Sequence, residues 1–148
     1  EVTVGLVGNF RLTSGESDCG IHVFPPMEVD MALYPPEEGG IYSNRLKVDL
    51  AEDFHITCPA PLSKEQSDEL TRLTTEAFRV TGCYDVARVD FRLDAHDNDR
   101  PYILEINPLP GLNPGYSDLC LEAEAEGWSY ERLINRILDE ASQRFGLC

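Results

Sequence analysis

Two short motifs contain the residues best suited to chemistry. Arg88 and Asp90 are separated by one apolar residue, and the same spacing separates Glu105 from Asn107. Because side chains alternate between the two faces of a β-strand, the members of each pair point to the same face. Carboxylate and amide oxygens are the hard ligands that Mg²⁺ prefers, and an arginine stabilises charge on a phosphoryl group. The motifs therefore predict a magnesium-nucleotide site.

A hairpin is the element that must position these side chains. The two motifs lie in β-rich segments, residues 86–93 and 102–107, which a polar loop joins. If the segments pair antiparallel in a compatible register, all four polar side chains gather on one open sheet surface, which Ile103 shares. The opposite, core-facing side carries the apolar residues of both segments, namely Ala87, Val89, Phe91, Leu93, Leu104 and Ile106.

A simpler interpretation of the first motif stays open. Arg88 and Asp90 could form an exposed cross-strand ion pair, worth about 0 to 1 kcal/mol, with the other two polar side chains merely facing solvent. The stretch that follows, residues 108–115, favours a site, because it is rich in Pro and Gly and sits directly after the second motif. Such a turn-rich loop can offer backbone N–H groups to an anion.

A calcium loop is a second alternative. Residues 94–105 begin with Asp and end with Glu at the spacing of an EF-hand. Asp99 occupies the position at which that loop needs a glycine for its sharp turn, and Pro101 follows it. Strand-like sequence also flanks the segment where an EF-hand has helices, so the residues argue against this alternative.

The remaining sequence predicts an α+β fold in which helices pack on one face of a largely antiparallel sheet. The first sixty residues are rich in Gly, Pro and β-branched residues, which favours short strands separated by turns. The strand candidates there are residues 1–7, 21–29, 40–48 and 54–57. Ser63 and Gln66 form a capping-box pattern. Helices are predicted at residues 63–81, at 117–127 and after Ser129, where an apolar stripe should pack on the sheet.

Composition limits the classes of function. A chain of 148 residues fits one domain, and its net charge of −15 argues against binding to nucleic acid. No apolar run approaches the roughly 20 residues that a membrane span requires. The five cysteines are widely spaced and support neither a zinc site nor a disulfide framework. The chain opens without Met and directly in a strand-like segment, so we expect a fragment of a longer protein.

Residues 87–91 (Ala-Arg-Val-Asp-Phe) and 104–111 (Leu-Glu-Ile-Asn-Pro-Leu-Pro-Gly) resemble the C-terminal part of D-alanine:D-alanine ligases in the ATP-grasp superfamily. Residues 1–4 and 58–62 are also similar to that family, so the resemblance covers nearly the whole chain. It implies that residues 1–148 form the C-terminal ATP-grasp lobe. The family's N-terminal substrate domain and first nucleotide lobe are absent from this sequence.

The resemblance also implies roles for single residues. Asp90, Glu105 and Asn107 would bind two Mg²⁺ ions, with Mn²⁺ as an alternative ion. Arg88 would contact the transferred phosphate, and Gly111 would offer its backbone N–H to the oxyanion. The other assignments concern the nucleotide and the second substrate: Glu1 for the ribose hydroxyls, Lys47 for a phosphate, and Ser117 with Leu119 for the second substrate.

The reaction that the resemblance implies is phosphorylation of a carboxylate by ATP, followed by attack of an amine on the acyl phosphate. ATP and small amino-acid-type substrates would be the partners, in cytoplasmic peptidoglycan synthesis, and the full-length protein could be a homodimer. The isolated lobe is expected to be inactive. Residues 113–118 depart from the common D-alanine pattern by one extra residue, which leaves open a ligase for a different amino or hydroxy acid. A noncatalytic ATP-grasp-derived binding domain is the other alternative.

Overall fold

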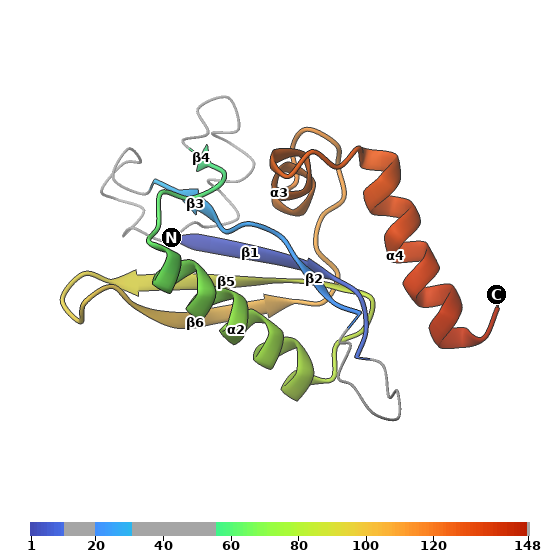
Figure 1. Cartoon of the computed structure of the whole chain (residues 1–148), viewed down its shortest axis with the longest axis horizontal. Helices are drawn as coiled ribbons and strands as arrows, with labels where there is room; N and C mark the ends of the chain where they lie inside the picture. The colour runs from blue at the N-terminus through green and yellow to red at the C-terminus, as the bar shows by residue number, and fades with distance from the viewer. Residues whose placement is uncertain (11–19, 31–55, 148) are drawn as a thin grey trace.

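The computed structural model describes residues 1–10, 20–30 and 56–147. In this part of the chain one six-stranded sheet lies between helices (Figure 1). The strands are β1 (Val2–Val7), β2 (His22–Val23), β3 (Met27–Val29), β4 (Ile56–Thr57), β5 (Val86–Asp94) and β6 (Arg100–Asn107). The helices are α2 (Lys64–Thr81), α3 (Asp118–Ala125) and α4 (Tyr130–Phe145). The predicted α+β class with an antiparallel sheet is confirmed.

Strand β1 is the centre of the sheet. It pairs with β5 on one side and with β2 and β3 on the other, and every pairing is antiparallel. The predicted strand at residues 21–29 is therefore two short strands, with Pro25 and Pro26 between them. Proline has no N–H to donate to a strand ladder, so the pairing is interrupted there. The strand predicted at residues 40–48 lies outside the described residues.

Helix α2 covers one face of the sheet. It begins at the predicted capping box, in which the Ser63 hydroxyl accepts from the Gln66 N–H and the Gln66 side chain accepts from the Ser63 N–H. It ends at Gly82, whose φ of 69° is left-handed and suits glycine. The core under this helix consists of alternate residues of the central strands, Val2, Val4, Val89 and Phe91, together with Leu70 and Ala77.

The opposite face carries α3 and, at one end of the sheet, α4. Val7 and Val86, which are paired residues of β1 and β5, pack there with Leu119 of α3 and Leu133 of α4. The prediction that all helices pack on one face is thus wrong in this respect. Successive residues of a strand point to opposite faces of the sheet. Val2 and Val4 make one face apolar under α2, and Val7 makes the other face apolar under α3.

The hairpin of β5 and β6 has the predicted pairing and one irregularity. Asp90 lies opposite Glu105, but a β-bulge follows, so that Phe91 lies opposite Ile103. The extra residue, Leu104, is 52% exposed and does not face the core as predicted. The bulge also moves Ile103 from the predicted polar face to the face of Phe91, because directly opposed residues share a face. Ile106 packs on the core as expected.

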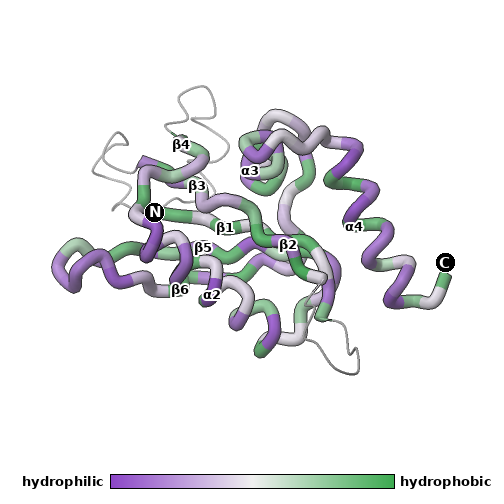
Figure 2. Tube along the Cα trace, viewed as in Figure 1, coloured by the Kyte–Doolittle hydropathy of each residue, from purple (hydrophilic) through white to green (hydrophobic). Residues whose placement is uncertain are grey.

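Helix α4 does not pack on the sheet along its length, contrary to the prediction. Its buried residues are Leu133 and Glu140, and its main helical neighbour is α3. Leu138 and Phe145 are largely exposed, and Figure 2 shows many hydrophilic residues along this helix, in contrast to β1. The apolar stripe was read correctly as a helix, but its spacing does not determine which surface covers it. No helix in the described part of the chain is long and apolar enough to cross a membrane.

Candidate functional site

The two motifs meet on one face of the hairpin, as predicted. The register places Arg88 opposite Asn107 and Asp90 opposite Glu105. Asn107 Nδ2 donates to Asp90 Oδ2 and to Glu105 Oε1, both at 3.2 Å. The four side chains therefore form one hydrogen-bonded polar cluster across two neighbouring strands. Residues 95–99 turn the chain between those strands and Glu105 lies within β6, so the alternative of a calcium loop is not supported.

Arg88 is buried among acids rather than exposed. Its Nε and Nη2 donate to the two oxygens of Asp90 at 2.8 Å each, and its Nη1 lies 2.8 Å from Asp118 Oδ2. Arg88 is 8% and Asp90 is 5% exposed, so the ion pair exists but is neither exposed nor cross-strand. Burial lowers the pKa of Arg88, but the hydrogen bond and charge of Asp90 and the charge of Asp118 outweigh it and raise the pKa. The guanidinium stays charged.

Strand β1 also contributes to the cluster. The Thr3 hydroxyl donates to Asp90 Oδ1 at 2.7 Å. Thr3 lies opposite Asp90 in the register, and Gly5 lies opposite Arg88. Because side chains alternate along β1, Glu1 continues the face of Thr3 and Gly5. The proposed ribose residue is therefore on the face of the polar cluster, at the open end of the strand.

The donor set suits a hard divalent cation. Oxygens of Asp90 and Glu105 converge on a single nitrogen of Asn107, so that nitrogen occupies a point where positive charge is favoured. Rotation of the amide by 180° would place its oxygen beside the two carboxylates and give a set of three oxygen ligands, which is the chemistry that Mg²⁺ prefers. The described residues contain no cluster of three or more His, Cys, Asp or Glu side chains at a metal-binding distance. Two carboxylates would therefore need the amide, water or a phosphate to complete a coordination shell.

The loop after β6 is closed by Ser117. The Ser117 hydroxyl accepts from the Asn113 N–H at 2.9 Å and makes no capping bond to α3, although Ser117 is the N-cap residue. A Cβ at Gly111 would lie 2.7 Å from the same hydroxyl, so glycine permits this close approach. The Tyr130 hydroxyl, which belongs to α4, donates to the Leu112 carbonyl at 3.1 Å. The loop from Gly111 to Ser117 is thus held at both ends.

Lys47 and Leu119 are the remaining predicted site residues. Lys47 lies outside the described residues. Leu119 is fully buried and packs in the core with Val7 and Val86, so its side chain faces the sheet. Any contact of Leu119 with a substrate would have to come from its backbone.

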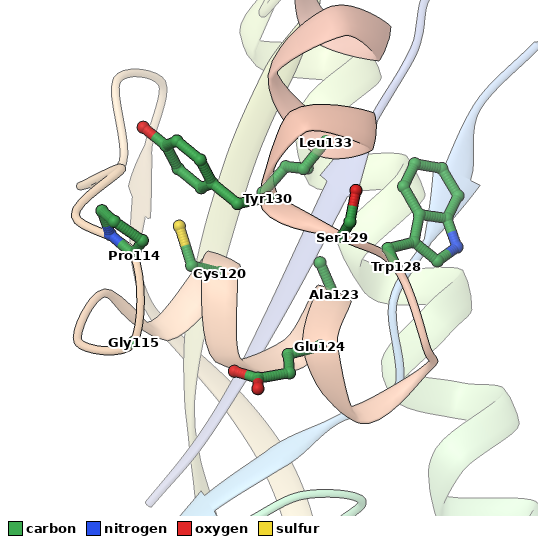
Figure 3. Close-up of a pocket in the computed structure, with 9 residues that line it drawn as sticks. All are labelled: Pro114, Gly115, Cys120, Ala123, Glu124, Trp128, Ser129, Tyr130 and Leu133. Atoms are coloured by element: carbon green, nitrogen blue, oxygen red, sulfur yellow. The ribbon is translucent and has the colours of Figure 1, made fainter.

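A pocket of about 410 Å³ lies behind the same loop, between α3 and the start of α4 (Figure 3). Its walls are largely apolar and include Pro114, Cys120, Trp128 and Leu133. Burial raises the pKa of the Cys120 thiol, which disfavours the reactive thiolate. None of the four residues of the polar cluster lines this pocket.

Three residues near the cluster were not predicted: Thr3, Asp118 and Glu122. Asp118 and Glu122 are four residues apart and so lie on one face of α3, and that face points to the sheet. Glu122 is fully buried and its Oε2 accepts from the Gly5 N–H at 2.6 Å. Burial raises the pKa of Glu122 well above its ordinary value. The signal that could have revealed Asp118 and Glu122 is the presence of two acids on the apolar side of a short helix.

The fold can be compared with solved structures. The structure resembles the D-alanine–D-alanine ligase from Coxiella burnetii, with a TM-score of 0.69, 21% identity and coverage of 97% of this chain and 32% of that one. It also resembles the Bacillus anthracis ligase complexed with ATP, with a TM-score of 0.64, 17% identity and coverage of 97% and 37%. These similarities show that the chain has the fold of the corresponding part of these two ligases.

Sequence comparison identifies the family. The model of the "D-ala D-ala ligase C-terminus" family matches residues 7–139, and the chain belongs to this family. A D-alanine–D-alanine ligase of Synechococcus sp. (strain JA-3-3Ab) is 38% identical over 113 residues, which are 76% of this chain and 33% of that ligase. The uncharacterized protein y4sG of Sinorhizobium fredii is 34% identical over 145 residues, 98% of this chain and 39% of y4sG. The chain thus spans about a third of the length of these relatives.

Proposed function

We propose that this chain is the Mg²⁺- and ATP-binding lobe of an ATP-dependent carboxylate–amine ligase of the D-alanine:D-alanine ligase type. The observation that supports the proposal most is the register of the hairpin. It opposes Asp90 to Glu105 and Arg88 to Asn107 on one face of the sheet. Membership of the family and the ATP complex of the B. anthracis neighbour agree with a nucleotide at this face.

Asp90, Glu105 and Asn107 would hold two divalent cations. Bound Mg²⁺ would neutralise the phosphate charges and polarise the transferred phosphoryl group. Arg88 then supplies a fixed positive charge to that group and to the tetrahedral intermediate formed when an amine attacks the acyl phosphate. A preorganised charge in a buried place stabilises such a state more than a solvated one does.

The remaining contacts follow the same proposal. Glu1 would accept hydrogen bonds from the ribose hydroxyls, and Lys47 would contact a phosphate. The Gly111 N–H would donate to the oxyanion. Ser117, with the backbone of Leu119, would hold the second substrate at the end of the loop that Ser117 itself closes.

The substrates are small amino acids, and D-alanine is the first candidate because the relatives include D-alanine–D-alanine ligases. A different amino or hydroxy acid is the alternative, because residues 113–118 depart from the common D-alanine pattern by one extra residue. We place the activity in the cytoplasm, where ATP is available, and in peptidoglycan synthesis if D-alanine is the substrate. A homodimer of the full-length protein stays a prediction.

The test is ATP-dependent phosphate release by the full-length protein, with Mg²⁺ or Mn²⁺ and a panel of D- and L-amino acids and hydroxy acids. We expect Arg88→Ala and Glu105→Ala each to reduce kcat at least about 100-fold, the scale typical of removing one transition-state contact. Product analysis by mass spectrometry identifies the amide or ester that forms.

Arg100→Ala and Glu65→Ala are the matched controls, because both residues are exposed and lie away from the cluster. They should retain the activity of the unmodified protein. If Arg88→Ala and Glu105→Ala both retained the activity of the unmodified protein, the assignment of the site would be refuted. Nucleotide binding without turnover for any acid in the panel would favour the noncatalytic alternative.

A further inference from the structure

Helix α3 approaches the sheet unusually closely at Gly5. A Cβ at Gly5 would lie 2.3 Å from Glu122 Oε2 and 2.3 Å from Leu119 Cδ1, so a larger residue would force these side chains to move. The Gly5 N–H lies where the pairing of β1 passes from β3 to β2, and Glu122 accepts it at 2.6 Å. Glu122 therefore fixes α3 against β1 at a break in the ladder.

Asp118 lies one helical turn before Glu122, on the same face of α3. This position brings its carboxylate to Arg88, with 2.8 Å between Asp118 Oδ2 and Arg88 Nη1. The two side chains are 12% and 10% exposed. Asp118 therefore approaches the guanidinium through a different nitrogen from those that Asp90 uses, and Arg88 is held between two carboxylates.

We propose that Asp118 is a positioning residue for Arg88, and that it couples the loop of residues 111–117 to the arginine that faces the transferred phosphate. This inference rests on the proposed function. A guanidinium bonded only to Asp90 could rotate out of the sheet plane or follow Asp90 when that carboxylate binds a cation. The second carboxylate retains Arg88 in place, because three of its nitrogens are then bonded in a fixed plane.

The coupling follows from the place of Asp118 in the chain. It is the first residue of α3 and comes directly after Ser117, which closes the loop on Asn113. A movement of the loop when the second substrate binds would therefore move Asp118 and, through it, Arg88. The arginine is correctly aimed only when the loop is closed, which would make phosphoryl-group stabilisation depend on the presence of the acceptor.

The experiment compares Asp118→Asn with Glu124→Gln in the full-length protein. Asn keeps the shape of Asp but removes the charge, and Glu124 is exposed on the same helix. We expect Asp118→Asn to lower kcat about 10- to 100-fold, since small misplacements of a reacting group have effects of that size. The KM for ATP should stay within about twofold, and the control should match the unmodified protein.

A second readout separates positioning from simple stabilisation. The ¹⁵Nε–H resonance of Arg88 should shift and exchange faster with water in Asp118→Asn, and Asp118→Glu should restore part of both kcat and the resonance. A variant in which kcat and the Arg88 resonance equal those of the control overturns the inference. So does a lower kcat that merely follows a lower unfolding temperature while the resonance is unchanged. If the unmodified protein shows no ATP-dependent reaction, the proposed function fails instead, and a shifted resonance would still locate the Asp118–Arg88 contact.

Discussion

The two faces of the central sheet are stabilised in different ways. Under α2, the face of Val4, Val89 and Phe91 is apolar throughout and is completed by residues of one helix. On the other face, Thr3, Arg88 and Asp90 are just as inaccessible, but they are bonded to one another and to Asp118. The first face gains stability from removing apolar surface from water, whereas the second must pair every charge that it buries.

Burial alone does not distinguish a core from a site. Phe91 and Asp90 are neighbours in sequence, and both are at most 5% exposed. What distinguishes them is the set of partners, apolar atoms in one case and directed donors in the other. Substitutions on the two faces should therefore lower the free energy of unfolding for different reasons.

The largest effect is expected on the apolar face. Phe91→Ala should lower the free energy of unfolding by about 4 kcal/mol, because it leaves a cavity under α2 and loses the transfer free energy of the ring. Urea unfolding of the variant measures this value. Tyr102→Ala, at a 46% exposed position of the same hairpin, should cost much less. Similar losses at both positions would contradict the assignment of this face as the core.

Arg88→Met should lower the free energy of unfolding by about 3 kcal/mol, because it removes the positive charge that Arg88 places between the buried carboxylates of Asp90 and Asp118. Arg100→Met removes an exposed arginine 3.6 Å from Asp97 and should change stability by less than about 1 kcal/mol. Adding Asp90→Asn to Arg88→Met should recover part of the loss. If the double variant were no more stable than Arg88→Met alone, the buried charge of Asp90 would not be the cause of the lost stability.

Gly5→Ala tests the close contact between β1 and α3. The new methyl group overlaps Glu122 Oε2 and Leu119 Cδ1, and we expect a loss of about 2 kcal/mol in the free energy of unfolding. A double-mutant cycle with Glu122→Ala provides the control, since that change removes one of the two overlapping groups. The cost of Gly5→Ala should be smaller in the Glu122→Ala background. An equal cost in both backgrounds would show that Glu122 does not limit the space.

The smallest effect is expected for Glu122→Gln at acid pH. Burial raises the pKa of Glu122 in the folded protein, so its stabilising contribution is complete below the ordinary carboxyl pKa of about 4.3 and is lost as pH rises. Gln keeps an acceptor for the Gly5 N–H and does not ionise. The stability of the variant relative to the unmodified protein should therefore increase with pH, by at most about 1.4 kcal/mol between pH 4 and pH 5.

Urea unfolding of both proteins across that pH range measures the difference. Glu124→Gln, at an exposed position of α3, is the matched control and should show no such trend. A constant difference for Glu122→Gln would indicate that folding does not raise the pKa of Glu122. A difference that falls as pH rises would indicate that folding lowers this pKa and favours the ionised carboxylate.

Local patterns were sufficient for much of this structure. The capping box at Ser63 and the glycine at residue 82 fix the ends of α2, because both act through bonds within a few residues. The alternation of residues 86–93 and 104–107 predicted which side chains share a face, and pairing in a compatible register brought Arg88 to Asn107 and Asp90 to Glu105. The error at Leu104 came from a bulge, which shifts alternation by one residue and leaves no clear mark in composition.

Residues close together in the chain were enough to predict the face that Arg88, Asp90, Glu105 and Asn107 share, the ends of α2 and the family motifs. Long-range contacts, in contrast, place α3 on the face opposite α2, bring Asp118 to Arg88, and leave Leu138 and Phe145 of the α4 stripe exposed. These facts depend on contacts between segments tens of residues apart. Periodicity states which side of an element is apolar, but not which other element will meet it.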